Sequence, residues 1–237
     1  MTIEAVIFDW GGTLTEPLEP LLGDVAVWHE AARALLPERE EEVVQELIAA
    51  EEELWELSRL EHRSSRLADL FSTAAQRLGV EIAEALLDEI HEAQLERYRP
   101  HIHHDPNAVR VLEGLRSRGL KLGLLSNTLW PGSFHESLLE ADGLGAVLDE
   151  RIYTSELHVT KPHPEAFHAI LEALGVREAG RAVFVGDRPW DDIFGAQRAG
   201  LRTVHRPRAT VPSHDVEPDA VITELPELLT IVDLWSR

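Results

Sequence analysis

Short strand-like runs alternate with helical patterns along most of the chain, and this alternation constrains the fold more than any other feature. The strand-like runs lie at residues 3–8, 121–125, 151–154, 182–185, 202–205 and, more weakly, 220–222. Helical patterns follow or separate them at about 107–118, 133–141, 164–174, 191–199 and 225–235. Strands that alternate with helices form βαβ units with a mainly parallel sheet. The sequence therefore predicts an α/β fold with a Rossmann-like, doubly wound core.

One long segment interrupts this alternation. Between residues 17 and 100 the chain has no strand-like run, and apolar residues recur at helical spacing, for example from Leu67 to Leu78. Gly79 separates two of these patterns and Pro100 ends the last one, as expected of residues that terminate helices. The segment is therefore expected to form about four helices.

The position of this segment indicates two domains. Residues 17–100 are predicted to form an all-helical cap domain, inserted into a core that comprises residues 1–16 and 101–237. The chain would enter the cap near Glu16 to Pro20 and leave it near Pro100 to Pro106. Two crossings that lie close together would make a hinge, so the cap is expected to close over the strand ends.

The formal net charge of −21 limits the partners that the chain can bind. Nucleic acid and anionic membranes both require a basic face, so neither is expected as a partner. The sequence has no cysteine, which excludes disulfides, thiol nucleophiles and cysteine-ligated metals. No apolar run is long enough to span a bilayer, and the first residues carry no leader pattern. We expect a soluble cytoplasmic protein that acts on a small molecule.

Polar clusters follow four of the predicted strands, at the positions where parallel sheets bind ligands. The first begins with Asp9, and the glycines after it are expected to leave backbone N–H groups free to bind an anion. A doubly wound sheet would bring all four clusters to one edge. They comprise Asp9 with Gly11, Gly12 and Thr13; Ser126, Asn127 and Thr128; Lys161 to Pro164; and Gly186, Asp187, Asp191 and Asp192.

The chemistry of these clusters is complementary. A carboxylate such as Asp9 can attack phosphorus and form an acyl phosphate, but it repels phosphate unless a divalent cation is present. Asp9 and Asp187 are hard oxygen ligands that suit Mg²⁺. Ser126 and the neighbouring backbone N–H groups could hold phosphoryl oxygens. Lys161, one of two lysines beside 20 arginines, would supply a fixed positive charge for phosphoryl transfer.

Four motifs in this order resemble the haloacid dehalogenase-like (HAD) hydrolase superfamily, in the branch that has a helical cap after the first motif. The matching stretches are Phe8 to Leu14, Leu125 to Thr128, Lys161 to Pro164 and Val185 to Ala196, and together they extend over most of the chain. The resemblance implies a Rossmann-like core, a helical cap and hydrolysis of a small phosphate ester with Mg²⁺ as cofactor.

The resemblance also implies a role for each matching residue. Asp9 would be the nucleophile, and Asp192, with Asp191 beside it, would orient Lys161 or metal-bound water. The implied metal ligands are Asp9, the carbonyl of Gly11, and Asp187; the implied substrate-binding residues are Gly12, Thr13, Ser126, Asn127 and Lys161.

Gly11 departs from the pattern of the family's phosphatases. These enzymes usually carry a second aspartate at this position, which acts as general acid and then as general base. General acid–base catalysis contributes about 10²–10⁴-fold, so its loss predicts slow turnover or another proton donor. The candidates are Glu16, a histidine of the cap such as His29 or His62, and a leaving group that needs no protonation.

Three other functions follow from this departure. A phosphonatase-like enzyme would need a cap lysine, and residues 15–100 contain none. A 2-haloacid dehalogenase would need no metal, whereas the Gly186–Asp187 pair favours one. A degenerate protein that binds phosphate without catalysis would not need Asp9, Lys161 and Asp187 together.

Two further groups of residues have a functional and a structural interpretation. His101, His103 and His104 with Asp105 indicate either a second metal site or a polar hinge between cap and core. Arg188 indicates either a clamp for a substrate anion or an ion pair with a neighbouring aspartate.

Tryptophans also follow the motifs. Trp10, Trp130 and Trp190 would either line an aromatic pocket for the leaving group or pack their loops onto the core. Trp28 and Trp55 are expected in the apolar core of the cap.

Overall fold

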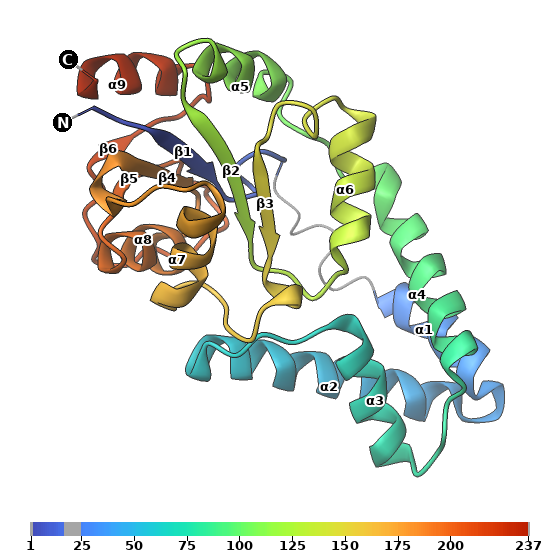
Figure 1. Ribbon diagram of the computed structural model, residues 1–237. Coiled ribbons are helices and arrows are strands. Elements are labelled where there is room, and N and C mark those ends of the chain that lie inside the picture. Colours follow the sequence, from blue (N-terminus) through green and yellow to red (C-terminus); the bar gives the residue numbers. More distant parts are fainter. Residues whose placement is uncertain (1, 17–24, 237) are drawn as a thin grey trace.

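The computed structural model describes residues 2–16 and 25–236 of the chain, and it has a six-stranded parallel sheet at its centre (Figure 1). The strand order is β3-β2-β1-β4-β5-β6, and every neighbouring pair is parallel. This is the doubly wound arrangement that the sequence predicts. The strands are β1 Ala5–Phe8, β2 Lys121–Ser126, β3 Glu150–Tyr153, β4 Ala182–Gly186, β5 Arg202–His205 and β6 Ala220–Val221.

The register of the three central strands determines where the polar clusters meet. Phe8, the last residue of β1, is paired with Leu124 of β2 on one side and with Val185 of β4 on the other. The residues that follow these strands therefore emerge at one edge of the sheet. The strand order reverses between β1 and β4, and such a reversal opens a crevice at the carboxyl ends of the strands.

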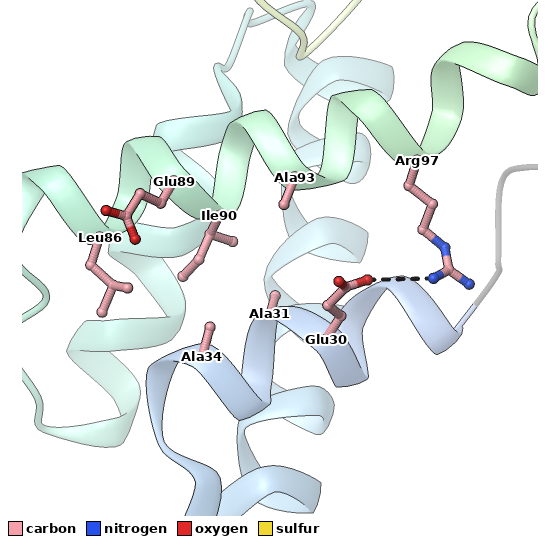
Figure 2. Close-up of a pocket in the computed structure, with 8 residues that line it drawn as sticks. All are labelled: Glu30, Ala31, Ala34, Leu86, Glu89, Ile90, Ala93 and Arg97. Carbon is pink, nitrogen blue, oxygen red and sulfur yellow. Dashed lines mark hydrogen bonds and ion pairs between the residues drawn. The ribbon is translucent and has the colours of Figure 1, made fainter.

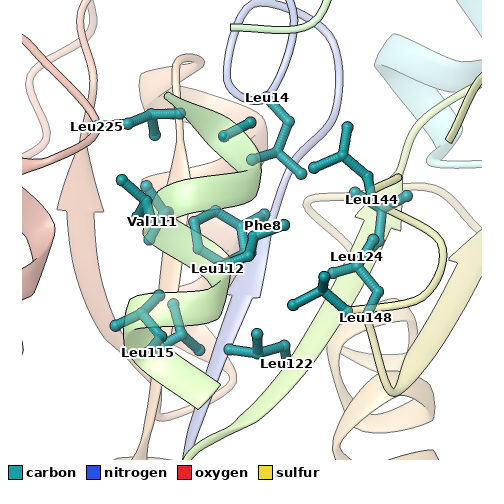
Figure 3. Packing of buried hydrophobic residues seen from close by; sticks show 14 of the residues in the cluster. Phe8, Leu14, Val111, Leu112, Leu115, Leu122, Leu124, Leu144, Leu148 and Leu225 are labelled. Carbon is teal, nitrogen blue, oxygen red and sulfur yellow. The ribbon is translucent and has the colours of Figure 1, made fainter. Parts of the chain in front are cut away.

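Both faces of the sheet are covered by helices, which explains why β1 and β4 carry no polar side chain. Val6 and Phe8 of β1 point into one core, which is shown in Figure 3, and Ala5 and Ile7 point into the other. The first core is closed by α5 Ala108–Arg116, α6 Gly132–Ala141 and α9 Glu227–Trp235, and the second by α7 Pro164–Ala173 and α8 Gly195–Arg198.

Four helices lie in the described part of the inserted segment, from residue 25 on, and they share an apolar core of their own. Trp28 is buried in this core, as predicted, whereas Trp55 is 41% exposed, so its predicted burial is wrong. Gly79 ends one helix with φ 69°, a left-handed conformation that favours glycine. The helices, called the helical unit below, are α1 Val25–Leu35, α2 Glu40–Glu61, α3 Leu67–Leu78 and α4 Glu84–Tyr98.

The two connections between the helical unit and the sheet core lie side by side. Thr15 forms an antiparallel bridge with His104, and the main-chain N–H of Glu16 donates to the carbonyl of His103 at 2.9 Å. Beyond Glu16 the predicted first crossing lies outside the described residues. The pairing of these two short stretches is the geometry expected of a hinge, while the predicted cap boundaries at residues 17 and 100 stay a prediction.

The helical unit also contacts the loops at the carboxyl ends of the strands. The N–H of Leu67 donates to the carbonyl of Leu129, and the N–H of Thr160 donates to the carbonyl of His62, both at 2.8–2.9 Å. Trp130 packs against the apolar cores of both parts. In Figure 1 the arrowheads of β2 and β3 point toward α2, so the unit faces the edge where the polar clusters lie.

The predicted helix over residues 191–199 differs in the structure. Residues Pro189–Phe194 form a π-helical turn, η5, and only Gly195–Arg198 continue as α8. This wider turn directs Asp192 toward the strand ends, where its side chain accepts a hydrogen bond from the Arg188 N–H. The 3₁₀ turns are η1 Pro37–Arg39, η2 Arg99–His101, η3 Thr154–Glu156 and η4 Ala179–Arg181. Among the described helices, none has the length and apolar character needed to cross a membrane.

Candidate active site

A buried lysine joins two buried carboxylates at the carboxyl edge of the sheet. Lys161 Nζ lies 2.6 Å from Asp9 Oδ1 and 2.8 Å from Asp192 Oδ1. The three side chains come from positions far apart in the sequence, and all are at most 9% exposed. Burial of an ammonium group lowers its pKa, but the charges of Asp192 and Asp9 outweigh this effect, and the pKa of Lys161 is raised. Lys161 is therefore a permanent cation in this site.

Asp187 completes a group of three carboxylates. Asp9, Asp187 and Asp192 each place one oxygen within 4.8 Å of the other two. Asp187 Oδ1 is buried, and it has no hydrogen-bond partner among the described residues. Burial raises the pKa of Asp187 to about 8 and that of Asp9 to about 6, although Lys161 acts in the opposite direction on Asp9. A buried carboxylate with an unpaired oxygen is the environment that a divalent cation would stabilise, so these residues fit a metal ion.

The loop after β1 approaches Asp187 closely because it carries glycine. Gly12 has φ 76°, a conformation that other residues rarely adopt. A Cβ atom at this position would lie 2.5 Å from Asp187 Oδ2. Gly11 is not among the positive-φ glycines of the described chain, so its backbone would accept a side chain.

Two backbone N–H groups that the sequence predicts as free anion donors are occupied in this structure. The Gly12 N–H donates to Thr15 Oγ1 at 3.1 Å, and the Thr13 N–H donates to the Trp10 carbonyl at 3.3 Å. The loop uses both bonds to close its own turn, which a sequence pattern does not reveal. Ser126, the last residue of β2, is buried beside this edge.

Comparison with known proteins places this geometry in a family. A family model described as a haloacid dehalogenase-like hydrolase matches residues 3–200. The chain belongs to the haloacid dehalogenase-like hydrolases. A glyceraldehyde 3-phosphate phosphatase of Methanopyrus kandleri is 31% identical, and the alignment covers 97% of both chains.

Solved structures of the same family have the same architecture. A HAD phosphatase from Thermococcus onnurineus has a TM-score of 0.68 at 27% identity, with 97% of this chain and 98% of that chain covered. A 2-haloacid dehalogenase from Pseudomonas syringae pv. Tomato has a TM-score of 0.73 at 27% identity, with 99% and 100% covered. Phosphatases and dehalogenases are therefore both close in fold to this HAD-like hydrolase.

Asn127 of the HAD-like hydrolase holds the main chain of the lysine. Its side-chain amide donates from Nδ2 to the Lys161 carbonyl and accepts the Lys161 N–H at Oδ1, each at 2.9 Å. Both ends of the amide are thus used to position Lys161. Its expected substrate-binding role stays a prediction, and in this structure the side-chain amide is used within the protein.

Sequence reasoning missed two arginines that follow β5. Arg206 is buried and donates to the Thr13 carbonyl at 2.6 Å and to Asp105 Oδ2 at 2.5 Å. Arg208 donates to the Gly12 carbonyl at 2.6 Å. Their position directly after a strand, at the same edge as the four motifs, is the signal that would have identified them.

The candidate proton donors differ in their surroundings. His29 Nδ1 lies 2.9 Å from Glu40 Oε1, so it is paired within the helical unit. His62 ends α2 in a left-handed conformation with φ 53°, and its buried Nδ1 has no partner among the described residues. Glu16 is exposed. None of these side chains has a hydrogen bond to Asp9 or Lys161 in the described structure.

The remaining candidates take structural contacts. Arg188 Nη1 lies 3.7 Å from Asp191 Oδ2, which favours the ion-pair interpretation. Trp10 and Trp130 both contact the ring of His135, whereas Trp190 stacks on Phe194 at 4.2 Å. Trp10 and Trp130 thus pack their loops onto the core, whereas Trp190 is 37% exposed.

Two hollows lie outside the carboxylate cluster. The first has a volume of about 210 Å³ between α1 and α4, and Figure 2 shows its mainly apolar lining with the Glu30–Arg97 ion pair at one end. The second, of about 480 Å³, lies where the start of α3 meets residues 155–158, and its lining is mainly polar. Neither is lined by a residue of the four motifs.

Proposed function

We propose that this chain is a Mg²⁺-dependent phosphatase that hydrolyses a small phosphomonoester through an aspartyl-phosphate on Asp9. The observation that supports it most is the buried Lys161 ammonium between the Asp9 and Asp192 carboxylates, beside an unpaired oxygen of Asp187. The relative from Methanopyrus kandleri, a glyceraldehyde 3-phosphate phosphatase, supports the same reaction class.

The metal site would consist of Asp9, Asp187 and the carbonyl of Gly11. Bound there, Mg²⁺ would offset the repulsion between carboxylate and phosphate and polarise the phosphoryl oxygens. The raised pKa of Asp187 supports this assignment, since its carboxylate form needs a nearby cation at neutral pH.

The protein side chains would carry out the transfer itself. The Asp9 carboxylate forms a bond to phosphorus while the bond between phosphorus and the leaving oxygen breaks. Lys161 has three N–H donors, of which Asp9 and Asp192 accept two, so the third is available for a phosphoryl oxygen. The Ser126 hydroxyl would donate another hydrogen bond. Water then attacks phosphorus, which releases inorganic phosphate and restores the Asp9 carboxylate.

Gly11 defines the class of ester that this site would hydrolyse best. Without a side-chain acid at position 11, the leaving oxygen departs without a proton from that position. Esters whose leaving group is stable as an anion, such as aryl and enol phosphates, should therefore react faster than simple alkyl phosphates.

The helical unit would act as the cap of this enzyme. It has its own apolar core, it is joined to the sheet by two paired stretches, and it contacts the loops at the carboxyl ends of the strands. Closure of such a unit would exclude water and select the leaving group.

Phosphate release from a panel of acyl, aryl and alkyl phosphates, with Mg²⁺ and with a chelator, tests the proposal. The Asp9→Asn variant should lose activity while it keeps its fold. Asp215→Asn, which changes an exposed aspartate elsewhere, is the matched control and should retain full activity.

Two results would overturn the proposal. Phosphate release that persists in Asp9→Asn would exclude Asp9 as the nucleophile. Halide release from 2-haloacids in the presence of chelator, without release of phosphate from any ester, would instead identify a dehalogenase.

A further inference from the structure

Trp10 follows the proposed nucleophile, Asp9, and holds the loop after β1 in place. Its side chain is only 2% exposed. Its carbonyl accepts the N–H groups of Thr13, Leu14 and Thr15 at 3.3, 2.9 and 3.0 Å. The turn from Asp9 onward is therefore folded around this one carbonyl, and movement of Trp10 would move the whole turn.

The indole of Trp10 is held in turn by a histidine and an aspartate. Trp10 Nε1 lies 3.1 Å from His104 Nε2, and His104 Nδ1 lies 2.6 Å from Asp142 Oδ2. An indole N–H can only donate, so His104 Nε2 must be the acceptor. The imidazole proton then lies on Nδ1 and is donated to Asp142. This chain of bonds requires neutral His104 in a single tautomer.

The backbone fixes His104 opposite the same loop. Thr15 and His104 form an antiparallel bridge, and the Asp105 N–H donates to the Leu14 carbonyl at 2.8 Å. His104 belongs to the second connection between the helical unit and the core. The hydrogen bond to Trp10 thus links this connection to the loop that carries Asp9.

Other titratable groups near His104 come from α6 and its end. His135 of α6 contacts the Trp10 ring edge-on, with centroids 4.5 Å apart, and stacks on Tyr153 at 4.7 Å. Burial lowers the pKa of His135 to about 3, so His135 is neutral. Burial also lowers the pKa of His104, which Asp142 opposes. Burial thus favours the neutral imidazole of His104 that the two hydrogen bonds require.

We propose that His104, oriented by Asp142, is a positioning residue that holds Trp10 and thereby fixes the Asp9–Gly11 loop for phosphoryl transfer. The expected effect on turnover rests on the proposed function, whereas the hydrogen bonds that hold Trp10 do not. The sequence offered His104 either as a metal ligand or as part of a polar hinge. Both of its ring nitrogens are instead occupied by Trp10 and Asp142.

The test compares two variants of His104 by NMR. His104→Gln retains an acceptor that can reach the Trp10 indole, whereas His104→Leu does not; both lose the hydrogen bond of the imidazole to Asp142. The native protein should show His104 protonated on Nδ1 and a hydrogen-bonded Trp10 indole N–H, assigned with Trp10→Phe. In His104→Leu that indole signal and the backbone amide signals of Asp9 to Gly11 should move, and in His104→Gln they should stay close to native.

Turnover provides the second readout. His104→Leu should lower kcat by about tenfold with KM changed less than about twofold, because the residue does not contact substrate. His104→Gln should restore most of the loss, while the melting temperatures of the two variants should be similar. Unmoved Asp9 and Gly11 amide signals in His104→Leu, or Nε2 protonation of native His104, would overturn the proposal. A native protein that shows the predicted NMR signals but releases no phosphate would count against the proposed function alone.

Discussion

The sheet core and the helical unit use charge in opposite ways. In the core, Lys161 and Arg206 are buried, and each is paired with buried carboxylates from distant parts of the sequence. In the helical unit, ion pairs such as Arg39–Glu42 and Glu30–Arg97 lie on the surface, whether they join neighbouring turns or two helices. Exposed pairs contribute little to stability, whereas a buried charge that loses its partner is costly. The formal charge of −21 therefore says little about the site, whose chemistry is decided by a few buried groups.

The largest effect should come from removing the central cation of the core. Lys161→Met would leave Asp9 and Asp192 buried without their shared partner, and the free energy of unfolding should fall by about 3 kcal/mol. Phosphate release should be lost as well. Chemical denaturation of the native and variant proteins measures the first effect. An unchanged stability would mean that these carboxylates are solvated or protonated in the folded protein.

A divalent cation should have the next largest effect, and it should depend on pH. Burial and the charges of Asp9 and Asp192 raise the pKa of Asp187 from 3.8 to about 8. The folded state then binds more protons than the unfolded state, so without a cation stability is lost as pH rises through this range. Mg²⁺ at about 100 times its Kd should restore about 2.7 kcal/mol.

Thermal unfolding with and without Mg²⁺ tests this linkage. The increase in melting temperature should be larger at about pH 8.5 than at about pH 6, because protons compete with the cation for the carboxylates. Asp187→Asn should abolish the increase. An equal increase at both pH values, or in Asp187→Asn, would place the cation elsewhere.

A smaller gain is expected from replacing the missing acid. Gly11→Asp should raise kcat for alkyl phosphates by at least about tenfold, since general acid–base catalysis contributes about 10²–10⁴-fold. The backbone at Gly11 does not require glycine, unlike that at Gly12. Gly12→Ala is the matched control and should lower activity. A folded Gly11→Asp variant with unchanged kcat would show that another group supplies the proton.

The smallest effect should be seen in the helical unit. Glu42→Gln removes the exposed partner of Arg39, and neither the melting temperature nor phosphate release should change measurably. A clear fall in the melting temperature would contradict the claim that exposed ion pairs contribute much less to stability than buried ones.

The fold was predictable because periodicity and strand ends are local signals. All six strand-like runs are strands, and Asp9, Lys161, Asp187 and Asp192 meet because their strands are parallel neighbours or their loops cross the same edge.

What the sequence did not reveal depends on tertiary contacts. Whether a backbone N–H at Gly12 is free depends on Thr15, three residues further on, and the roles of Arg206 and Asn127 depend on long-range hydrogen bonds. Trp55 was expected in a core because it is apolar, yet it lies off the buried face of α2, which consists of Val43, Val44, Leu47, Ala50 and Leu54. The π-helical turn at Pro189–Phe194 replaces the start of a predicted helix. Its Asp192 side chain accepts a hydrogen bond from the Arg188 N–H, a contact that helical periodicity does not reveal.

The central claim is a covalent phosphoryl group on Asp9, and acid quenching followed by peptide mass spectrometry tests it most directly. With no carboxylate at position 11 to activate water, hydrolysis of the intermediate should be slow, so the intermediate should accumulate during turnover. We predict a phosphorylated peptide containing Asp9 that forms only with Mg²⁺ and is absent from Asp9→Asn. Steady release of phosphate without that peptide, in protein quenched within the first turnover, would contradict the account.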